Sequence, residues 1–290
     1  MDVIEDFIEA KRAPGGSIRF KGKSLSDASL RTGLLALGLI LQRAMRMKLL
    51  SGNPMREVEW RGLPRRDAQT IDPFNTSELQ AILTAARGLD PDFATMLRLW
   101  AQTGMRAGEV CGLHRHDVDL DKGTALVRRT WSRRRLGPTK TGIVRQVNIL
   151  HPIADETPDW RAGATPQCLQ VAAGLKALKL QSLDPEAFVL GHGHTPMSSM
   201  ELHRKWRRVL LAAKVRYRAP EQLRHTFAST MLSRNAPLLY VQQQGGWRSA
   251  SVLLRVYARW MPQEPTSAPS VTPVSPAAQT VAEAGRPSAS

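Results

Sequence analysis

The sequence predicts a mainly α-helical protein with a small antiparallel β-sheet, an α+β fold, and two observations support this prediction. Apolar residues recur at helical spacing through most of the chain, as in Leu30, Leu34, Leu37 and Leu41. Between residues 124 and 150 the spacing changes to the alternation that is typical of strands. Helices therefore supply most of the fold, and one short region supplies the sheet.

The composition of the 290-residue chain indicates a polyanion as its partner. Lys and Arg total 41 against 25 Asp and Glu, the formal charge is +16, and 42% hydrophobic residues are enough for a packed core. On charge alone, a ribosomal or nucleoid protein is an equally good interpretation. Two cysteines offer neither a disulfide framework nor a metal-ligand cluster. The acidic N-terminus lacks the basic region of a signal peptide, and the apolar run at 34–41 is too short to cross a bilayer, so we expect a cytoplasmic protein with no membrane partner.

The N-terminal region predicts one long helix. Ser26 is a suitable N-cap, Gly52-Asn53-Pro54 is expected to end the helix, and residues 1–23 carry only a weak helical pattern. Residues 62–73, with two prolines and two arginines, indicate a linker. The basic residues near the end of the helix are candidates for DNA contact, namely Arg43, Arg46 and Lys48.

After the linker, the sequence predicts two helices and a candidate anion site. Asn75 and Glu78 have the spacing of a capping box, and Gly88 and Gly104 are expected to end the two helices. In Thr-Gly-Met-Arg-Ala-Gly-Glu-Val at 103–110, a new helix starts at Arg106. A helix start favours an anion, and a guanidinium there can hold two phosphate oxygens. Taken alone, Arg106 is more simply a surface arginine.

The predicted strands carry a second group of basic residues. Lys140 lies in Gly-Pro-Thr-Lys-Thr-Gly at 137–142, a predicted turn from which a lysine can reach a DNA groove. An ordinary exposed loop lysine is the alternative. Three consecutive arginines are expected to contact phosphates without reading the base sequence, namely Arg133, Arg134 and Arg135.

Two more helices are expected between residues 168 and 210. The first spans Cys168–Leu180, and the second begins with a capping box of Ser198 and Glu201. His192 and His194 lie in a glycine loop without a third ligand nearby, which favours a turn over a metal site. The second helix has an apolar core face (Leu202, Trp206, Val209 and Leu210) and a basic face with candidate DNA contacts (Arg204, Arg207 and Arg208).

The stretch from 221 to 260 combines an arginine and a tyrosine on two helices. Gly245 and Gly246 provide a helix stop and a sharp turn, which lets the helix of Tyr257 fold back toward that of Arg224. A tyrosine hydroxyl facing an arginine-bound anion is expected for attack on a phosphodiester. A buried core tyrosine is the alternative. Residues after 261 are rich in Pro, Ser, Ala and Thr, and are expected to be disordered.

Three segments together resemble the tyrosine recombinases of the phage integrase family. They are Thr-Gly-Met-Arg-Ala-Gly-Glu at 103–109, Thr-Lys-Thr at 139–141, and Arg-His-Thr-Phe-Ala-Ser at 224–229 followed by Leu-Arg-Val-Tyr-Ala at 254–258. The resemblance covers roughly residues 24–260. It implies a short helical core-binding domain over 1–66, a linker over 67–73, a catalytic domain over 74–261 and a tail over 262–290.

The resemblance implies a site-specific DNA strand exchange that uses neither a cofactor nor a metal. Arg106 and Arg224 would stabilise the charge of the phosphate in the transition state, Tyr257 would form a 3′-phosphotyrosine link, and Lys140 would protonate the leaving 5′-hydroxyl. Trp247 would hydrogen-bond the phosphate or pack against the tyrosine helix. The supporting residues would be Glu109 and His225.

Glu221 departs from the family pattern, which usually has histidine at this position. A glutamate can still accept the proton of the tyrosine, and Arg224 lies one helical turn away, where the two side chains can meet. The implied partners are double-stranded DNA, a homotetramer in the synaptic complex and DNA-bending accessory proteins. Two alternatives remain open: a catalytically impaired DNA-binding relative, and an enzyme of the type IB topoisomerase kind.

Overall fold

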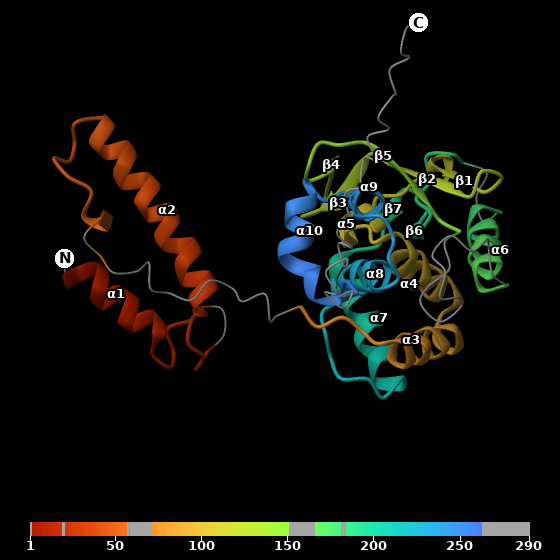
Figure 1. Cartoon of the computed structure of the whole chain (residues 1–290). Helices are drawn as coiled ribbons and strands as arrows, with labels where there is room; N and C mark the ends of the chain where they lie inside the picture. The colour runs from red at the N-terminus through yellow and green to blue at the C-terminus, as the bar shows by residue number, and fades with distance from the viewer. Residues whose placement is uncertain are drawn as a thin grey trace, which may run out of the picture.

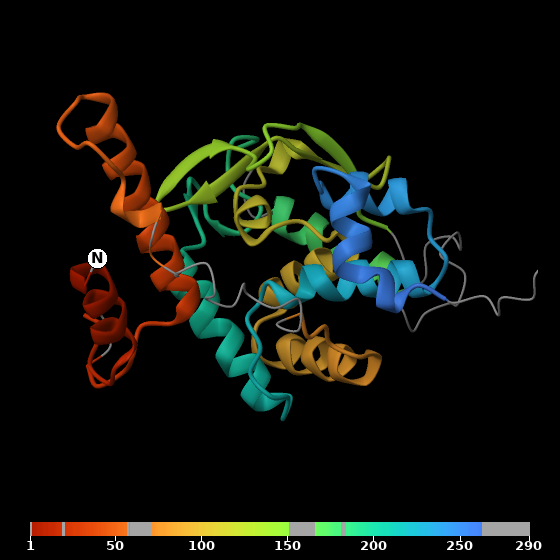
Figure 2. The ribbon, with the colours of Figure 1, turned by 60° about the vertical axis from the view of Figure 1, so that its left-hand side comes forward.

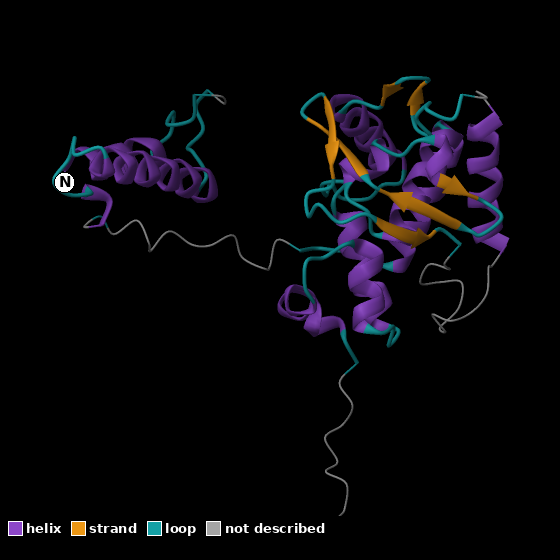
Figure 3. Ribbon diagram, turned by 90° about the horizontal axis from the view of Figure 1, so that it is seen from above, coloured by secondary structure: helices purple, strands orange, loops and turns teal. Residues whose placement is uncertain are grey.

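The computed structural model describes residues 2–18, 21–56, 58, 71–150, 166–180 and 184–262 (Figure 1). Helices predominate in it and the strands are short, as the colours of Figure 3 show. The expected mainly α fold with a small antiparallel sheet is therefore confirmed. Residues 67–70 of the predicted linker and 263–290 of the predicted tail lie outside the described residues, and the domain boundaries stay predictions.

The described N-terminal residues contain the helices α1 over Asp2–Arg12 and α2 over Asp27–Arg46. Ser26 caps α2 as the sequence predicts, because its hydroxyl accepts a hydrogen bond from the backbone N–H of Ser29. Leu30 and Leu34 are buried between α2, the helix α1 and the short 3₁₀ helix η1 over Pro54–Arg56. A small hydrophobic cluster therefore holds the two helices together.

Two expectations for this part were wrong. Residues 2–12 form a full helix, although only Ile4 and Ile8 pack on the cluster, so the contact with α2 stabilises a segment whose own pattern is weak. The helix α2 ends at Arg46, before Gly52, because Lys48 has a left-handed backbone with φ of 59°.

The helices α3 over Thr76–Leu89 and α4 over Pro91–Thr103 begin the larger part. Asn75 and Glu78 make both hydrogen bonds of the predicted capping box. The helix α3 runs one residue past Gly88, and Gly104, with φ of 61°, ends α4 as predicted. The helix α5 over Ala107–Cys111 follows directly, which puts Arg106 at its N-cap position.

In the part of the chain that the structure describes, the strands form three small antiparallel sheets rather than one. A three-stranded sheet has the order β1-β2-β5, and Ala125 of β2 pairs with Val147 of β5. A hairpin of β3 and β4 branches from it, with Arg133 and Arg134 at its tip, and a third pair precedes α7. The bounds are β1 Val118–Asp119, β2 Thr124–Val127, β3 Arg129–Ser132, β4 Arg135–Pro138, β5 Arg145–Asn148, β6 Gly191–His192 and β7 Thr195–Pro196.

The helices α6 over Pro166–Leu180 and α7 over Ser199–Ala212 lie close to where the sequence predicts them. Ser198 caps α7 by accepting a hydrogen bond from the N–H of Glu201. The capping box is not completed, because the Glu201 carboxylate lies near Lys205 instead. The predicted core face of α7 is buried as expected: Leu202, Trp206, Val209 and Leu210.

The last three α-helices are α8 over Gln222–Ser233, α9 over Leu238–Gly245 and α10 over Ala250–Tyr257, followed by the 3₁₀ helix η5 over Ala258–Trp260. Figures 1 and 2 show α10 next to α8 and α9, and side chains of all three share one hydrophobic cluster. The fold-back that Gly245 and Gly246 predict is therefore present.

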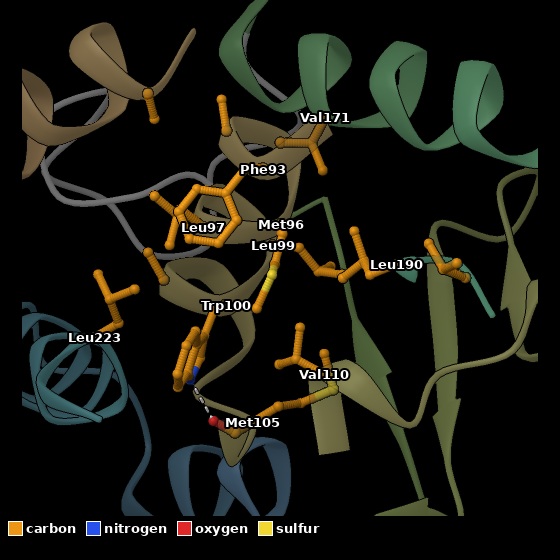
Figure 4. Close-up of a cluster of buried hydrophobic side chains, with 14 of the residues drawn as sticks. Phe93, Met96, Leu97, Leu99, Trp100, Met105, Val110, Val171, Leu190 and Leu223 are labelled. Atoms are coloured by element: carbon orange, nitrogen blue, oxygen red, sulfur yellow. Dashed lines mark hydrogen bonds between the residues drawn. The ribbon is translucent and has the colours of Figure 1, made fainter. Parts of the chain in front are cut away.

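The main core surrounds α4, which is buried on nearly every side. Phe93, Met96 and Trp100 lie inside it, and the indole N–H of Trp100 donates a hydrogen bond to the carbonyl oxygen of Met105 at 2.7 Å (Figure 4). This bond ties the end of α4 to the turn before Arg106. Within the described residues, the structure contains no helix of sufficient length and apolarity to cross a membrane.

Candidate active site

Arg106 lies at the start of α5, between two loops that meet there. Its Nη1 donates to the Glu109 carboxylate at 3.0 Å, and its Nη2 donates to the carbonyl oxygen of Gly246 at 3.1 Å. Its backbone N–H donates to the same carboxylate at 2.9 Å. The side chain is 25% exposed, so an anion can reach it, and the ion pair holds its direction.

Arg224 enters the same region from the first turns of α8. Its Nη1 donates to the carbonyl oxygens of Gly104 and Gly245, and its Cζ lies 3.7 Å from the ring centroid of Trp247. Burial lowers the pKa of Arg224 to about 9, and the positive charge of Arg106 adds to that effect. The guanidinium therefore stays charged at neutral pH, and Nη2 and Nε make no hydrogen bond within the described residues.

Arg145, a residue that the sequence analysis missed, braces the site from β5. Both of its Nη atoms reach the Glu109 carboxylate, the shorter bond being 2.7 Å, and it also donates to the carbonyl oxygens of Gln244 and Gly245. The alternation of Arg145, Val147 and Ile149 was the available signal, because it puts the arginine on the buried face.

Glu109 is fully buried between Arg106 and Arg145. Burial alone would raise the pKa of its carboxyl, but the hydrogen bonds and charges of the two arginines outweigh it and hold that pKa below its ordinary value of 4.5. The carboxylate is therefore ionised at neutral pH, and it keeps both guanidiniums in fixed directions. Its expected role as a supporting residue in catalysis stays a prediction.

The chain turns sharply at Gly245 and Gly246 and brings Trp247 against Arg224. Gly246 has φ of 71°, and a Cβ there would lie 2.6 Å from the Cζ of Arg145. The carbonyl oxygens of both glycines accept hydrogen bonds from the site arginines. Only glycine combines this backbone conformation with so close an approach.

Tyr257 ends α10 and is enclosed by aromatic rings. It is 0% exposed, and its ring centroid lies 5.8 Å from those of Trp247, Trp260 and His225. Its Oη lies 2.6 Å from Nδ1 of His225. Burial raises the pKa of the Tyr257 hydroxyl well above its usual value, and the charge of Arg224 offsets part of this rise.

The structure does not bring Lys140 or Glu221 into this cluster. Lys140 is exposed in the turn between β4 and β5, where the sequence predicts it. Glu221 is exposed at the N-cap of α8, and its side chain makes no hydrogen bond or ion pair with any described residue, Arg224 included. The roles predicted for both residues stay predictions.

The candidate DNA-contacting residues lie on three exposed surfaces, at the end of α2, at the tip of the β3–β4 hairpin and on α7. Their side chains are all exposed: Arg43, Arg46, Lys48, Arg133, Arg134, Arg135, Arg204, Arg207 and Arg208. Arg207 also lies over the ring of Tyr217, at 5.6 Å from the centroid. Exposure is required for phosphate contact, and DNA contact by these residues stays a prediction.

One cluster of potential metal ligands occurs in the part of the chain that the structure describes, formed by His114, His116 and Glu186. His116 already uses both ring nitrogens, since Nδ1 lies 2.8 Å from the carbonyl oxygen of Pro185 and Nε2 contacts the guanidinium of Arg128. The positive charge of Arg128 beside His116 opposes the binding of a metal cation, so we attribute the cluster to hydrogen bonding. His192 and His194 precede α7 as expected, and His194 pairs with Asp184 at 2.7 Å.

Comparison with known proteins assigns the chain to a family. Residues 74–264 match the model of the phage integrase family, and because this match spans more than half of the chain, the chain belongs to that family. Family membership is consistent with a site of two arginines and a tyrosine on adjoining helices.

Two relatives come from Escherichia coli. The protein IntQ, whose name describes it as defective, is 24% identical over 281 residues, which cover 90% of this chain and 67% of IntQ. The prophage integrase IntR is 26% identical over 250 residues, which cover 83% of this chain and 59% of IntR. The chain therefore spans between 59% and 67% of the length of these curated relatives.

A solved structure shares the fold. The integrase of the transposon Tn1549, in complex with a circular intermediate DNA, superimposes with a TM-score of 0.64 at 16% identity, over 88% of this chain and 80% of that one. At this level of identity the likeness concerns the fold.

Proposed function

We propose that this chain is a site-specific DNA recombinase of the integrase type, which cleaves and rejoins strands through a covalent 3′-phosphotyrosine intermediate. The observation that carries the proposal is the convergence of Arg106, Arg224 and Trp247 on the turn that leads to Tyr257. Two charged guanidiniums held by backbone carbonyls would form an anion site, and the ring of Tyr257 packs edge to face against the indole that covers one of them.

The proposed reaction uses the two arginines and Tyr257 of this cluster, and gives Lys140 the role that the family resemblance implies. A phosphodiester bound by Arg106 and Arg224 gains negative charge in the transition state, which both guanidiniums stabilise. Tyr257 Oη attacks phosphorus, and Lys140 donates a proton to the departing 5′-oxygen. The phosphotyrosine bond then receives the 5′-hydroxyl of another strand, so the reaction requires neither nucleotide nor added metal.

The partner we propose is double-stranded DNA with a specific recombination site. The net charge of +16 supports this partner, as do the DNA complexes of the Tn1549 integrase and of the lambda integrase, whose structure was solved as a dimer on a core site. We further propose a homotetramer in the synaptic complex, DNA-bending accessory proteins, and action in the cytoplasm.

A second candidate is a DNA-binding relative with impaired catalysis. The exposed Glu221 at the position of the usual histidine and the name of IntQ favour it. A topoisomerase of type IB is distinguished by relaxation of supercoiled plasmid without a specific site.

The test is covalent trapping. The protein first selects a binding sequence from a random pool of duplexes, and that sequence is then prepared with a nick beside the cleaved bond. The short fragment that carries the new 5′-hydroxyl diffuses away, so the adduct accumulates. The recombinase proposal predicts a protein–DNA adduct in EDTA without nucleotide. Binding without an adduct at any nick position supports the impaired relative instead. An adduct that strictly requires magnesium contradicts the mechanism.

A further inference from the structure

The Tyr257 hydroxyl has one hydrogen-bonding partner in the described structure, and it is a histidine. His225 Nδ1 lies 2.6 Å from Tyr257 Oη, with the two rings inclined by 41°. His225 directly follows Arg224 on α8, so a proton acceptor and an anion-binding group are carried by consecutive residues of one helix. The same helix therefore positions both the group that contacts Oη and the guanidinium at which we propose that the phosphate binds.

Because of its surroundings, Tyr257 can lose its hydroxyl proton only to a group that is in direct contact with the hydroxyl. The side chain is shielded from solvent by Trp247, Trp260 and His225, so water does not reach Oη in this state. Burial also raises the pKa of the hydroxyl, so it does not ionise unaided near neutral pH.

Glu221, the residue at the position of the usual family histidine, does not meet this requirement. Its carboxylate is exposed and makes no side-chain hydrogen bond or ion pair with the described residues. A general base must lie within hydrogen-bond reach of the proton that it removes, and His225 meets that condition directly.

We propose that His225 is a catalytic residue that accepts the Tyr257 proton during DNA cleavage. This inference rests on the proposed recombinase function. The proton passes from Tyr257 Oη to Nδ1 of a neutral His225, while Oη forms a bond to phosphorus. The bond from phosphorus to the 5′-oxygen breaks, and that oxygen takes a proton from Lys140. Rejoining reverses both transfers.

The charged and titratable groups near this pair allow the step to be followed by pH. Among the described residues they include Arg224 on α8, Tyr240 on α9, packed in the same cluster, and Arg259 on η5, whose Cζ lies 4.0 Å from the ring centroid of Trp260. Burial lowers the pKa of Arg224 to about 9 and raises that of Tyr240, so neither changes charge between about pH 5 and 8. Glutamate side chains such as that of Glu221 ordinarily titrate near about 4.3, and histidine near about 6.5.

The experiment measures single-turnover adduct formation on the nicked duplex from about pH 5 to about pH 9.5, spanning histidine titration. Wild type is expected to speed up as a histidine deprotonates. His225→Gln is expected to be slower by about 10² to 10⁴ at neutral pH, the range of a lost general base, and to lack that rise. Glu221→Gln should keep the wild-type profile.

A substrate with sulfur in place of the leaving 5′-oxygen separates the two proton transfers. A thiolate leaves without a proton, so this substrate should restore cleavage by Lys140→Ala but not by His225→Gln. Urea unfolding and DNA affinity of each variant serve as checks on folding and binding.

The outcomes separate this inference from the function on which it rests. If wild type forms no adduct, the proposed function fails. The proposed role of His225 is wrong if wild type forms an adduct and His225→Gln keeps the wild-type pH profile. It is also wrong if His225→Gln reacts faster, because the hydrogen bond between His225 and Tyr257 would then only restrain the tyrosine. The proposed role of His225 is also overturned if Glu221→Gln loses the rise in rate with pH and His225→Gln keeps it.

Discussion

At the scale of single residues, Glu109 organises the arginine cluster. One buried carboxylate pairs with Arg106 at 3.0 Å and with Arg145 at 2.7 Å, and each arginine then reaches backbone carbonyls of the turn at 244–246. Without this negative charge, two buried or half-buried guanidiniums would face each other with only carbonyl dipoles between them. Removing one partner from such a group is costly, because the others stay buried without compensation.

We therefore predict that Glu109→Gln lowers the free energy of unfolding by about 3 kcal/mol at pH 7. The folded pKa of Glu109 lies below its ordinary value of 4.5, so its contribution is fully present above pH 4.5 and is lost as the pH falls through the folded pKa. The difference between wild type and variant, measured by urea unfolding, should shrink below pH 4.5. A difference that stays constant down to pH 3 would contradict this account. Asp121→Asn, at an exposed position, is the control and should change stability by less than about 0.5 kcal/mol.

At the scale of elements, the turn between α9 and α10 sets the distance between Arg224 and Tyr257. Gly246 ends α9 with φ of 71°, and its N–H donates back to the carbonyl oxygen of Gln242 at 2.8 Å. The guanidinium of Arg145 fills the space beside its Cα. Backbone conformation and side-chain packing therefore both exclude a larger residue.

Comparison of two glycines separates these effects. Gly142 has φ of 73°, but nothing lies within 4 Å of a Cβ placed there, whereas at Gly246 the Cβ would lie 2.6 Å from Arg145 Cζ. Gly142→Ala should cost about 1 kcal/mol for the left-handed backbone. Gly246→Ala should cost about 1–3 kcal/mol more, because the guanidinium must move. Equal shifts in the urea midpoint would show that Arg145 does not pack tightly on this turn.

Most elements could be predicted from local sequence patterns, and the exceptions depend on long-range contacts. Ser26 and Asn75 cap helices as predicted, because an N-cap is decided within one turn. The helix α1 was missed because its stability comes from packing on α2. The strand β2 pairs with β5, and the β3–β4 hairpin lies between them in the sequence. The alternation of apolar residues does not reveal which strands pair.

The candidate site was predictable where a residue lies in a recognisable motif. Arg106, Arg224, Trp247 and Tyr257 were found in this way, and the structure gathers them. Arg145 was missed because its contacts are made to residues 36 to 100 positions away. The exposed position of Glu221 also depends on tertiary structure, because helical spacing alone allows it to pair with Arg224.

At the scale of the whole molecule, the net charge of +16 is spread over separate exposed surfaces rather than confined to the site. Phosphate contacts release counterions, so DNA affinity should fall steeply with salt. The hairpin tip at 133–135 is the most concentrated of these surfaces, with three arginines in succession.

We predict that changing Arg133, Arg134 and Arg135 to Gln reduces the slope of log affinity against log salt by about 2 to 3, one phosphate contact per arginine. A control variant with Lys21, Lys23 and Lys122 changed to Gln should alter the slope by less than about one. These lysines are exposed but are not expected to contact DNA. Similar slopes for the two variants would show that the tip binds DNA no more closely than the general surface.

The central claim is that Tyr257 itself forms the covalent bond to DNA. Mass spectrometry of proteolysed adduct from the nicked duplex tests it most directly. The account predicts that the peptide containing Tyr257 carries a nucleotide through its phosphate, and that Tyr257→Phe binds the same DNA without forming an adduct. A nucleotide attached to Tyr217, to Tyr240 or to any other residue, or an undiminished adduct yield from Tyr257→Phe, would contradict it.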